Sequence, residues 1–293
     1  MHLPAPERAR FLDVNRTRLR LWEWGDESAP AAVCVHGAYD HGRMWDWMAP
    51  RLADLGFRVV APDLRGHGDS GRLGSGEMWA ASALDLALLA RELGPPVGMI
   101  GHSFGAGQAM FTGGVWPELV RWVVNLDGLG QSDPPEERSL AERAADSWAA
   151  AERVLLRPPR VYASLEEMVE RRGSVNGRLP TPWVEHLVRH GARPAEGGFV
   201  WKSDPMFSVG TPGEWGPEYE DAELALLTRP LLVLTGAEPD TWSEMSPAQI
   251  DERMALFDNA RHSAVDGAGH YVHIEQPEIV LAAVSAFITE VAP

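Results

Sequence analysis

The sequence has a single cysteine, Cys34, among 293 residues, so an intramolecular disulfide is excluded. A lone cysteine within an apolar run is typical of a protein in a reducing compartment. No stretch reaches the roughly 18 consecutive apolar residues that a membrane-spanning helix needs. Residues 1–10 carry charge and proline and lack the apolar centre of a signal peptide. We therefore expect a cytoplasmic protein with no membrane partner.

Positive charge is scarce. The chain has 26 lysine and arginine residues against 42 aspartate and glutamate residues, which gives a formal net charge of −16. This excess of negative charge disfavours nucleic acid and anionic membrane surfaces as partners, and it favours solubility. With 45% hydrophobic residues and no internal repeats, the chain can bury a large core as one domain or as a domain with an insertion.

Signals for a metal or a cofactor are also missing. The ten histidines are scattered and show no metal-ligand spacing, and the single cysteine adds no cluster. The glycine-rich stretches lack the Lys-Ser/Thr ending of a phosphate-binding loop, which argues against nucleotide binding. We therefore expect chemistry that needs neither a metal nor a cofactor.

Strands and helices alternate along most of the chain. Apolar or alternating runs predict strands at 11–14, 19–24, 31–35, 57–61, 97–100, 121–126, 231–234 and 262–265. Helical patterns cover 44–55, 80–93 and 277–291, and a further helix begins at Ala106. This alternation predicts an α/β fold with a doubly wound, mostly parallel sheet and right-handed crossovers.

The pattern changes after Gly130. Charged, amphipathic helices are predicted at 136–156, 164–172 and 181–190, with no buried strand between them. Prolines and glycines separate these helices. We interpret residues 131–221 as a helical cap, or lid, inserted into a core that consists of 1–130 and 222–293.

The most informative motif is Gly101-His102-Ser103-Phe104-Gly105. It lies between the predicted buried strand at 97–100 and the helix that begins at Ala106, where the chain must turn sharply. At such a turn the serine hydroxyl is pushed out toward substrate, and the flanking glycines permit a strained backbone and close strand–helix packing. Ser103 is therefore predicted to be a nucleophile.

A serine nucleophile needs a base and an oxyanion hole. His270 directly follows the last predicted strand, and the chain order of serine first and histidine last suits this kind of sheet. We predict that His270 is the base. The predicted oxyanion-hole donors are the backbone N–H groups of Ala38, just after the His36-Gly37 turn, and of Phe104, just after the serine.

Four segments together resemble the α/β-hydrolase superfamily, in its branch with a serine nucleophile and a helical cap. They are His36-Gly37, Asp63 to Ser70, Gly101 to Gly105 and Gly269 to Glu278. The resemblance covers nearly the whole chain apart from the cap, and it implies the fold and a catalytic triad. Epoxide hydrolases and haloalkane dehalogenases of this fold use an aspartate nucleophile, whereas position 103 is serine.

The sequence leaves more than one candidate for the acid of the triad. Many members of the superfamily carry an aspartate after the strand represented here by 231–234, but that position is Pro239. The neighbouring carboxylates, Glu238 and Asp240, are each off by one residue. Some members instead place the acid after the strand that follows the nucleophile helix, and Asp127 resembles theirs. We prefer Asp127 and keep Asp240 and Glu238 as alternatives.

The cap is expected to set substrate choice. Trp148 and Trp183 would place large aromatic groups near the cleft, and aromatic walls suit an apolar or aromatic substrate. The sequence thus predicts a cofactor-free serine hydrolase that cleaves a carboxylic ester or a lactone through an acyl-enzyme on Ser103. The alternatives are a carbon–carbon bond hydrolase, a haloperoxidase-like enzyme of the same fold, and a ligand receptor with weak turnover.

Overall fold

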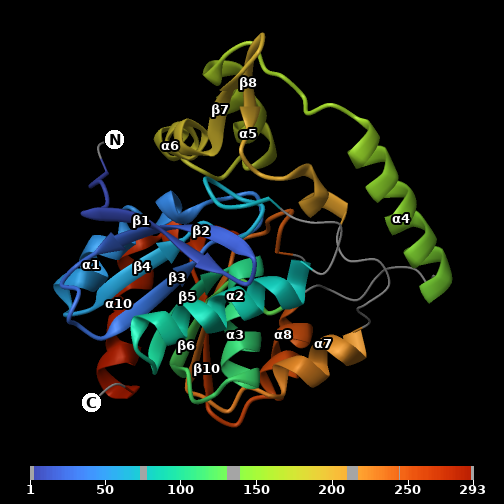
Figure 1. Ribbon diagram of the computed structural model, residues 1–293. Coiled ribbons are helices and arrows are strands. Elements are labelled where there is room, and N and C mark those ends of the chain that lie inside the picture. The colour runs from blue at the N-terminus through green and yellow to red at the C-terminus, as the bar shows by residue number, and fades with distance from the viewer. Residues whose placement is uncertain (1–2, 73–77, 131–138, 210–216, 244, 292–293) are drawn as a thin grey trace.

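Eight strands form one sheet in the computed structural model, which describes residues 3–72, 78–130, 139–209, 217–243 and 245–291 (Figure 1). In spatial order the strands are β1 (Arg8–Val14), β2 (Thr17–Trp24), β4 (Arg58–Pro62), β3 (Ala31–Val35), β5 (Val97–His102), β6 (Val120–Leu126), β9 (Leu231–Gly236) and β10 (Ala260–Val265). The pairs β1–β2 and β2–β4 are antiparallel, and every other neighbouring pair is parallel. The predicted doubly wound, mostly parallel sheet is confirmed.

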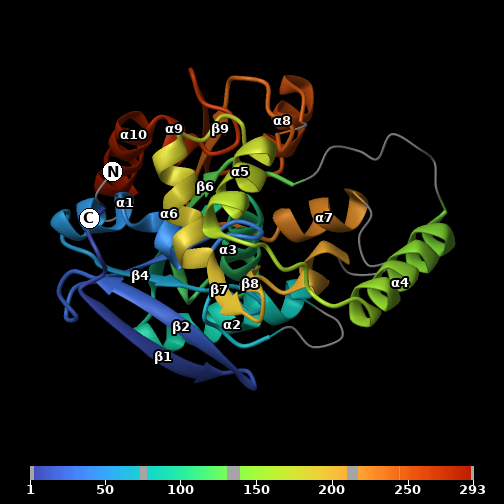
Figure 2. The ribbon, with the colours of Figure 1, turned by 90° about the horizontal axis from the view of Figure 1, so that it is seen from above.

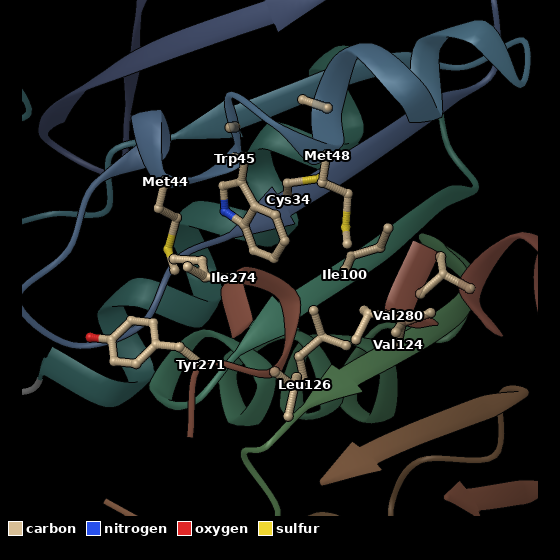
Figure 3. Packing of buried hydrophobic residues seen from close by; sticks show 14 of the residues in the cluster. Cys34, Met44, Trp45, Met48, Ile100, Val124, Leu126, Tyr271, Ile274 and Val280 are labelled. Carbon is tan, nitrogen blue, oxygen red and sulfur yellow. The ribbon is translucent and has the colours of Figure 1, made fainter. Parts of the chain in front are cut away.

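Helices cover both faces of this sheet. The helices α1 (Met48–Asp54) and α10 (Pro277–Val291) pack on one face, and α2 (Met78–Leu93), α3 (Phe104–Val115) and α7 (Pro217–Leu224) pack on the other. Figure 3 shows part of the first core, where Cys34 and Ile100 of the sheet gather with Met48 and Val280 of the helices. Because the strands β3, β4, β5, β6 and β9 are buried along nearly their whole length, this part of the sheet could be predicted from continuous apolar runs. No helix in these described ranges is long and apolar enough to cross a bilayer.

The parallel strands end at a common edge of the sheet. Ser103 directly follows β5, Asp127 directly follows β6, and His270 lies in the loop after β10. Ligands of open α/β sheets bind outside the carboxyl ends of the strands, because the loops that follow the strands meet there. The topology therefore brings these three residues to one side of the sheet.

Residues 139–209, called the cap segment from here on, lie over this edge. The segment contains α4 (Leu140–Leu156), α5 (Leu165–Val175), α6 (Thr181–Gly191), a hairpin of β7 (Ala192–Ala195) and β8 (Gly198–Trp201), and the 3₁₀ helix η2 (Pro205–Val209). Figures 1 and 2 show α5, α6 and the hairpin above the sheet and α4 to one side. All three predicted helices are present. The first begins at Leu140 after the capping box of Ser139 and Glu142, and residues 136–138 of the prediction lie outside the described residues.

The hairpin β7–β8 was not predicted. Its turn needs glycine, because Gly197 and Gly198 have φ values of +82° and +148°, and a Cβ on Gly198 would lie 2.0 Å from the carbonyl oxygen of Tyr162. The strand β7 has only four residues and includes Arg193 and Pro194, so it carries no apolar alternation. The paired glycines were the only local signal of a turn between strands.

Other helical regions also differ from the sequence-based prediction, and no helix was predicted at α7 or at the short α9 (Val272–Glu275). The helix predicted at 44–55 is divided into the 3₁₀ helix η1 (Gly42–Trp45) and α1. The helix α8 (Pro247–Met254), between β9 and β10, was missed although its start carries a clear signal. Ser246 and Gln249 form a capping box, and proline occupies the first helical position. The division into core and cap stays a prediction, and its boundary at residue 222 falls inside α7.

Candidate active site

Ser103 occupies a strained turn between β5 and α3, with φ of 52° and ψ of −124°. Such a backbone is uncommon for a residue other than glycine and persists only where its surroundings enforce it. A Cβ on Gly101 would lie 2.3 Å from the carbonyl oxygen of Gly105, and a Cβ on Gly105 would lie 2.4 Å from that of His36. The two motif glycines are therefore required by the close packing of α3 against the ends of the strands.

The loop after β3 carries Ala38, and two buried neutral histidines hold this loop. The Nε2 atom of His36 accepts a backbone N–H from the loop after β4 at 2.9 Å, and Nε2 of His67 accepts the N–H of Tyr39 at 3.2 Å. Burial lowers the pKa of His67 to about 4, so its ring stays neutral and can accept this hydrogen bond at neutral pH. Ala38 lines the same cavity as Ser103. Phe104 is the first residue of α3, where an N–H has no acceptor within the helix.

Asp127 reaches the imidazole of His270. Its Oδ2 atom accepts the Nδ1–H of His270 at 2.7 Å, and the Ser243 hydroxyl donates to the same oxygen. Its Oδ1 atom accepts the backbone N–H of Gly236 at 3.1 Å. Both carboxylate oxygens are thus engaged, so the carboxylate holds one orientation of the ring and one tautomer, with the proton on Nδ1.

The turn after β6 aims this carboxylate. The side chain of Asn125 accepts the N–H of Gly128 at 2.8 Å and donates to its carbonyl oxygen at 3.0 Å. Asp127, between them, has a φ of +53°, which aspartate tolerates better than most residues do. A Cβ on Gly128 would lie 2.3 Å from the carbonyl oxygen of Ser103. The turn is therefore packed against the serine elbow and could not accept a larger residue at position 128.

The two alternative carboxylates hold the loop of His270 rather than its ring. Asp240 Oδ2 accepts the backbone N–H of His270 at 3.2 Å, and Glu238 Oε1 accepts the N–H of Gly267 at 3.3 Å. His102, next to the serine, donates from Nε2 to the carbonyl oxygen of His270 at 3.0 Å. Of the three carboxylates considered from the sequence, Asp127 is the one that contacts the imidazole.

A cavity of about 360 Å³ contains both Ser103 and His270 in its wall. The sheet side contributes the loop of Ala38, and the cap segment contributes residues of α5 and β8, including Arg171 and Trp201. A volume of this size falls within the range of small-molecule sites. The arrangement suits a small substrate that enters between sheet and cap.

The two tryptophans predicted to line the pocket lie elsewhere. Trp183 is 5% exposed and packs edge-on against His186 inside the cap segment, and Trp148 is 61% exposed on α4. Neither is part of the cavity wall, whereas Trp201 and Trp242 are. The amphipathic pattern located these side chains on helices, but the direction that each helix faces depends on tertiary packing.

A buried ion pair links the cap segment to the sheet beside the cavity. Arg172 Nη2 donates to Asp40 Oδ1 at 2.7 Å and to the hydroxyl oxygen of Tyr271 at 2.8 Å, and that hydroxyl donates to Asp40 Oδ2 at 3.0 Å. Burial raises the pKa of Asp40, and the guanidinium of Arg172 opposes this rise. Because Tyr271 follows His270, the pair also connects α5 to the loop of the predicted base. Sequence reasoning missed this pair, because no local pattern signals a contact across 132 residues.

One cluster outside the cavity contains metal-ligating groups, which corrects the expectation of scattered histidines. Ligand atoms of Asp46, His186 and His190 lie within 4.8 Å of one another. A guanidinium already occupies this position: Arg43 donates from Nε and Nη2 to Asp46 Oδ2 at 2.8 and 2.6 Å, and its Nη1 lies 3.3 Å from His190 Nδ1. We interpret the cluster as an ion-pair network that joins η1 to α6.

Comparison with known proteins identifies the family of this chain. Residues 32–283 match a family model that is described as "Alpha/beta hydrolase family". Epoxide hydrolase A of Mycobacterium tuberculosis is 25% identical over 330 aligned positions, which cover 96% of this chain and 97% of the relative. The 2-(acetamidomethylene)succinate hydrolase of Mesorhizobium japonicum is 28% identical, with 96% and 95% covered. Among solved structures, an esterase of Mycobacterium tuberculosis has a TM-score of 0.74 at 21% identity and covers 99% of this chain and 93% of its own.

Proposed function

The chain belongs to the α/β hydrolase family, and from this premise we propose that it is a serine hydrolase that cleaves a carboxylic ester or a lactone without a cofactor. One observation carries the proposal: Asp127 Oδ2 lies 2.7 Å from His270 Nδ1, in a site whose cavity also contains Ser103. A carboxylate behind an imidazole, beside a strained serine, is the arrangement that nucleophilic acyl transfer requires.

The first half of the proposed reaction forms an acyl-enzyme. Ser103 Oγ attacks the carbonyl carbon of the substrate while His270 Nε2 takes the hydroxyl proton. Asp127 keeps the other ring proton on Nδ1 and stabilises the imidazolium that forms. The N–H groups of Ala38 and Phe104 donate to the carbonyl oxygen as it gains negative charge. The leaving alcohol takes the proton from His270, and the acyl group stays on Ser103.

The second half releases the acid. His270 removes a proton from a water molecule as the water oxygen attacks the acyl-enzyme, and the same N–H groups stabilise the new oxyanion. Collapse of this intermediate returns the proton to Ser103 and frees the carboxylic acid. With a lactone, the alcohol stays attached to the acyl group, so the product is one hydroxy acid.

The aromatic residues of the cavity wall favour a substrate that has an apolar or aromatic part. Tyr39, Tyr162, Trp201 and Trp242 all line it. Aromatic rings contribute large apolar contact areas to a ligand and favour flat or apolar groups. These aromatic residues take the place that the sequence-based prediction gave to Trp148 and Trp183.

The relatives support hydrolysis, but they do not identify the bond that this chain cleaves. Epoxide hydrolases of this fold use an aspartate nucleophile, and this chain has Ser103 at that position. We therefore do not transfer epoxide hydrolysis from the Mycobacterium tuberculosis relative. The remaining alternatives of the same fold, including a carbon–carbon bond hydrolase, differ in the bond that is cleaved.

Covalent labelling tests the nucleophile. The native protein, treated with a fluorophosphonate, should gain the mass of one adduct, and Ser103→Ala should gain none. Ser203→Ala removes another serine of the cavity wall and should still be labelled. A native protein without an adduct, or a Ser103→Ala variant that still carries one, overturns the proposal. Hydrolysis rates for p-nitrophenyl esters and for lactones then identify the substrate class.

A further inference from the structure

The cavity wall differs in charge from the rest of the molecule. The chain carries 42 acidic and 26 basic residues, yet the wall residues that the structure describes include two arginines, Arg171 and Arg172, and no aspartate or glutamate. In so acidic a chain, permanent positive charges in the described part of a cavity wall favour a ligand of opposite sign.

Both arginines come from one face at the end of α5. The residues that this helix contributes to the wall are 171, 172 and 175, which lie together at its last turn, and Asn176 follows directly as the residue that ends the helix. The face combines two guanidinium groups with the amide of Asn176. A guanidinium and an amide both offer N–H donors, which suit the oxygens of an anion.

The side chains of Arg171, Arg172 and Asn176 differ in whether they have partners within the protein. Arg172 is held by Asp40 and the Tyr271 hydroxyl, so its charge is largely offset. The side chain of Arg171 makes no hydrogen bond or ion pair with any residue that the structure describes. Asn176 is only 8% exposed, and within the described ranges its side-chain amide also has no hydrogen-bond partner. Because Asn176 lines the cavity, its unpartnered amide can donate to a ligand there.

We propose that Arg171 and Asn176 bind a carboxylate of the substrate, so that the preferred ester carries a negative charge in addition to its apolar or aromatic part. The inference rests on the proposed function for the position of the reacting bond. Arg171 presents a planar fork of donors that matches the two oxygens of a carboxylate, and Asn176 adds a donor from the next turn.

Neighbouring negative charges do not cancel this site. Two described carboxylates contact residues of the cavity wall and are engaged by them, Asp40 by Arg172 and Asp127 by His270. The end of α5 itself carries the negative end of the helix dipole, which is equivalent to about half a charge. The full charge of Arg171 exceeds this partial charge, so the end of α5 stays positive.

Two pairs of esters test whether the preferred substrate carries its negative charge in the acyl chain or in the leaving group. Mono-p-nitrophenyl adipate carries a carboxylate in the acyl chain, and p-nitrophenyl hexanoate is its neutral counterpart. In the second pair, 3-carboxy-4-nitrophenyl butyrate carries it in the leaving group, and p-nitrophenyl butyrate is neutral. At least one anionic ester should have the higher kcat/KM of its pair. This preference should fall by about 10- to 100-fold in Arg171→Gln and be partly kept in Arg171→Lys.

Arg193→Gln is the matched control, because it removes the same charge from an exposed position of β7 outside the cavity. It should keep the preference, which separates binding at the site from a general effect of net charge. The inference is wrong if neither anionic ester is preferred, or if Arg171→Gln and Arg193→Gln change the preference equally.

Binding to Ser103→Ala measures the same site without turnover. Calorimetry should show tighter binding of an anionic ester than of its neutral counterpart, and an added Arg171→Gln or Asn176→Leu substitution should remove that difference. Equal binding of both esters overturns the carboxylate site even if native protein labels at Ser103. A charge preference in binding without any labelling overturns the proposed reaction and keeps the carboxylate site.

Discussion

The sheet side and the cap side of the cavity differ in how their polar groups are partnered. On the sheet side, Asp127 and His270 bond to each other, and the loop of Ala38 is held by buried histidines. On the cap side, the side chains of Arg171 and Asn176 have no hydrogen-bond partner among the described residues. Groups that carry out chemistry must be held in one geometry, whereas groups that bind a substrate must have free donors. This difference assigns the proposed chemistry to the sheet and the proposed specificity to the cap segment.

The two sides also differ in how the chain builds them. Ser103 and Asp127 directly follow parallel strands, so the sheet itself sets their separation. The α5 face belongs to the cap segment, and the Arg172–Asp40 pair links it to the sheet side. We therefore expect changes on the sheet side to affect the rate of the chemical step, and changes on the cap side to affect cap attachment and substrate choice.

The largest effect is expected from the carboxylate behind the imidazole. Asp127→Asn should lower kcat by on the order of 10⁴, because the amide no longer holds the required tautomer or stabilises the imidazolium. Asp240→Asn is the control, since the Asp240 carboxylate accepts the backbone N–H groups of His270 and Trp242 rather than the imidazole N–H, and an amide oxygen can still accept the bond from His270. Steady-state hydrolysis of one activated ester compares the two. A nearly unchanged kcat in Asp127→Asn would show that another group orients the base.

The next largest effect concerns the link between the two sides. Breaking the buried Asp40–Arg172 pair from either end, with Asp40→Leu or Arg172→Met, should lower the free energy of unfolding by about 3–5 kcal/mol, because one charge stays buried without its partner. The double variant should lose much less than the sum of the two, and urea denaturation of all four proteins measures this coupling. Additive losses would show that the pair does not act as a unit.

Acid should weaken the loop that carries Ala38. Burial holds the pKa of His67 at about 4, whereas an unfolded histidine titrates near 6.5. Below that pH the unfolded state binds more protons, so this contribution to stability is present above about pH 6.5 and is lost as the pH falls toward 4. Relative to native protein, His67→Asn should lose about 2 kcal/mol less between about pH 7.5 and about pH 5.

Denaturation at the two pH values measures this difference, and the comparison removes the loss that His67→Asn causes at neutral pH. Equal pH dependence in native protein and variant would show that His67 does not stay neutral in the folded state.

The smallest effects separate two tryptophans of the cap segment. Trp201→Ala removes an aromatic group from the cavity wall and should raise KM for an aromatic ester by about 2- to 10-fold. Trp148→Ala should leave the kinetics unchanged and alter stability by less than about 0.5 kcal/mol, because this side chain is 61% exposed. If Trp148→Ala raises KM as much as Trp201→Ala does, α4 contributes to substrate binding after all.

The sequence predicted elements with strong local signals and missed those without them. Buried parallel strands such as β3 are continuous apolar runs, and the serine turn combines two glycines with a strand and a helix, so both could be located. The hairpin β7–β8 could not, because its first strand contains arginine and proline. The helix α8 could have been found, since the capping box at Ser246 marks its start.

By itself, the sequence determined the sheet, the serine turn and the late position of His270. Hydrophobic periodicity and glycine spacing are local properties, so they can be recognised without knowing how the chain folds. Tertiary structure alone decided which of three carboxylates reaches the imidazole and which tryptophans face the cavity. It also paired Asp40 with Arg172 and left the Arg171 side chain beside the cavity without a hydrogen-bond partner among the described residues. Contacts between distant segments depend on how whole helices and strands pack, and no short run of residues encodes that arrangement.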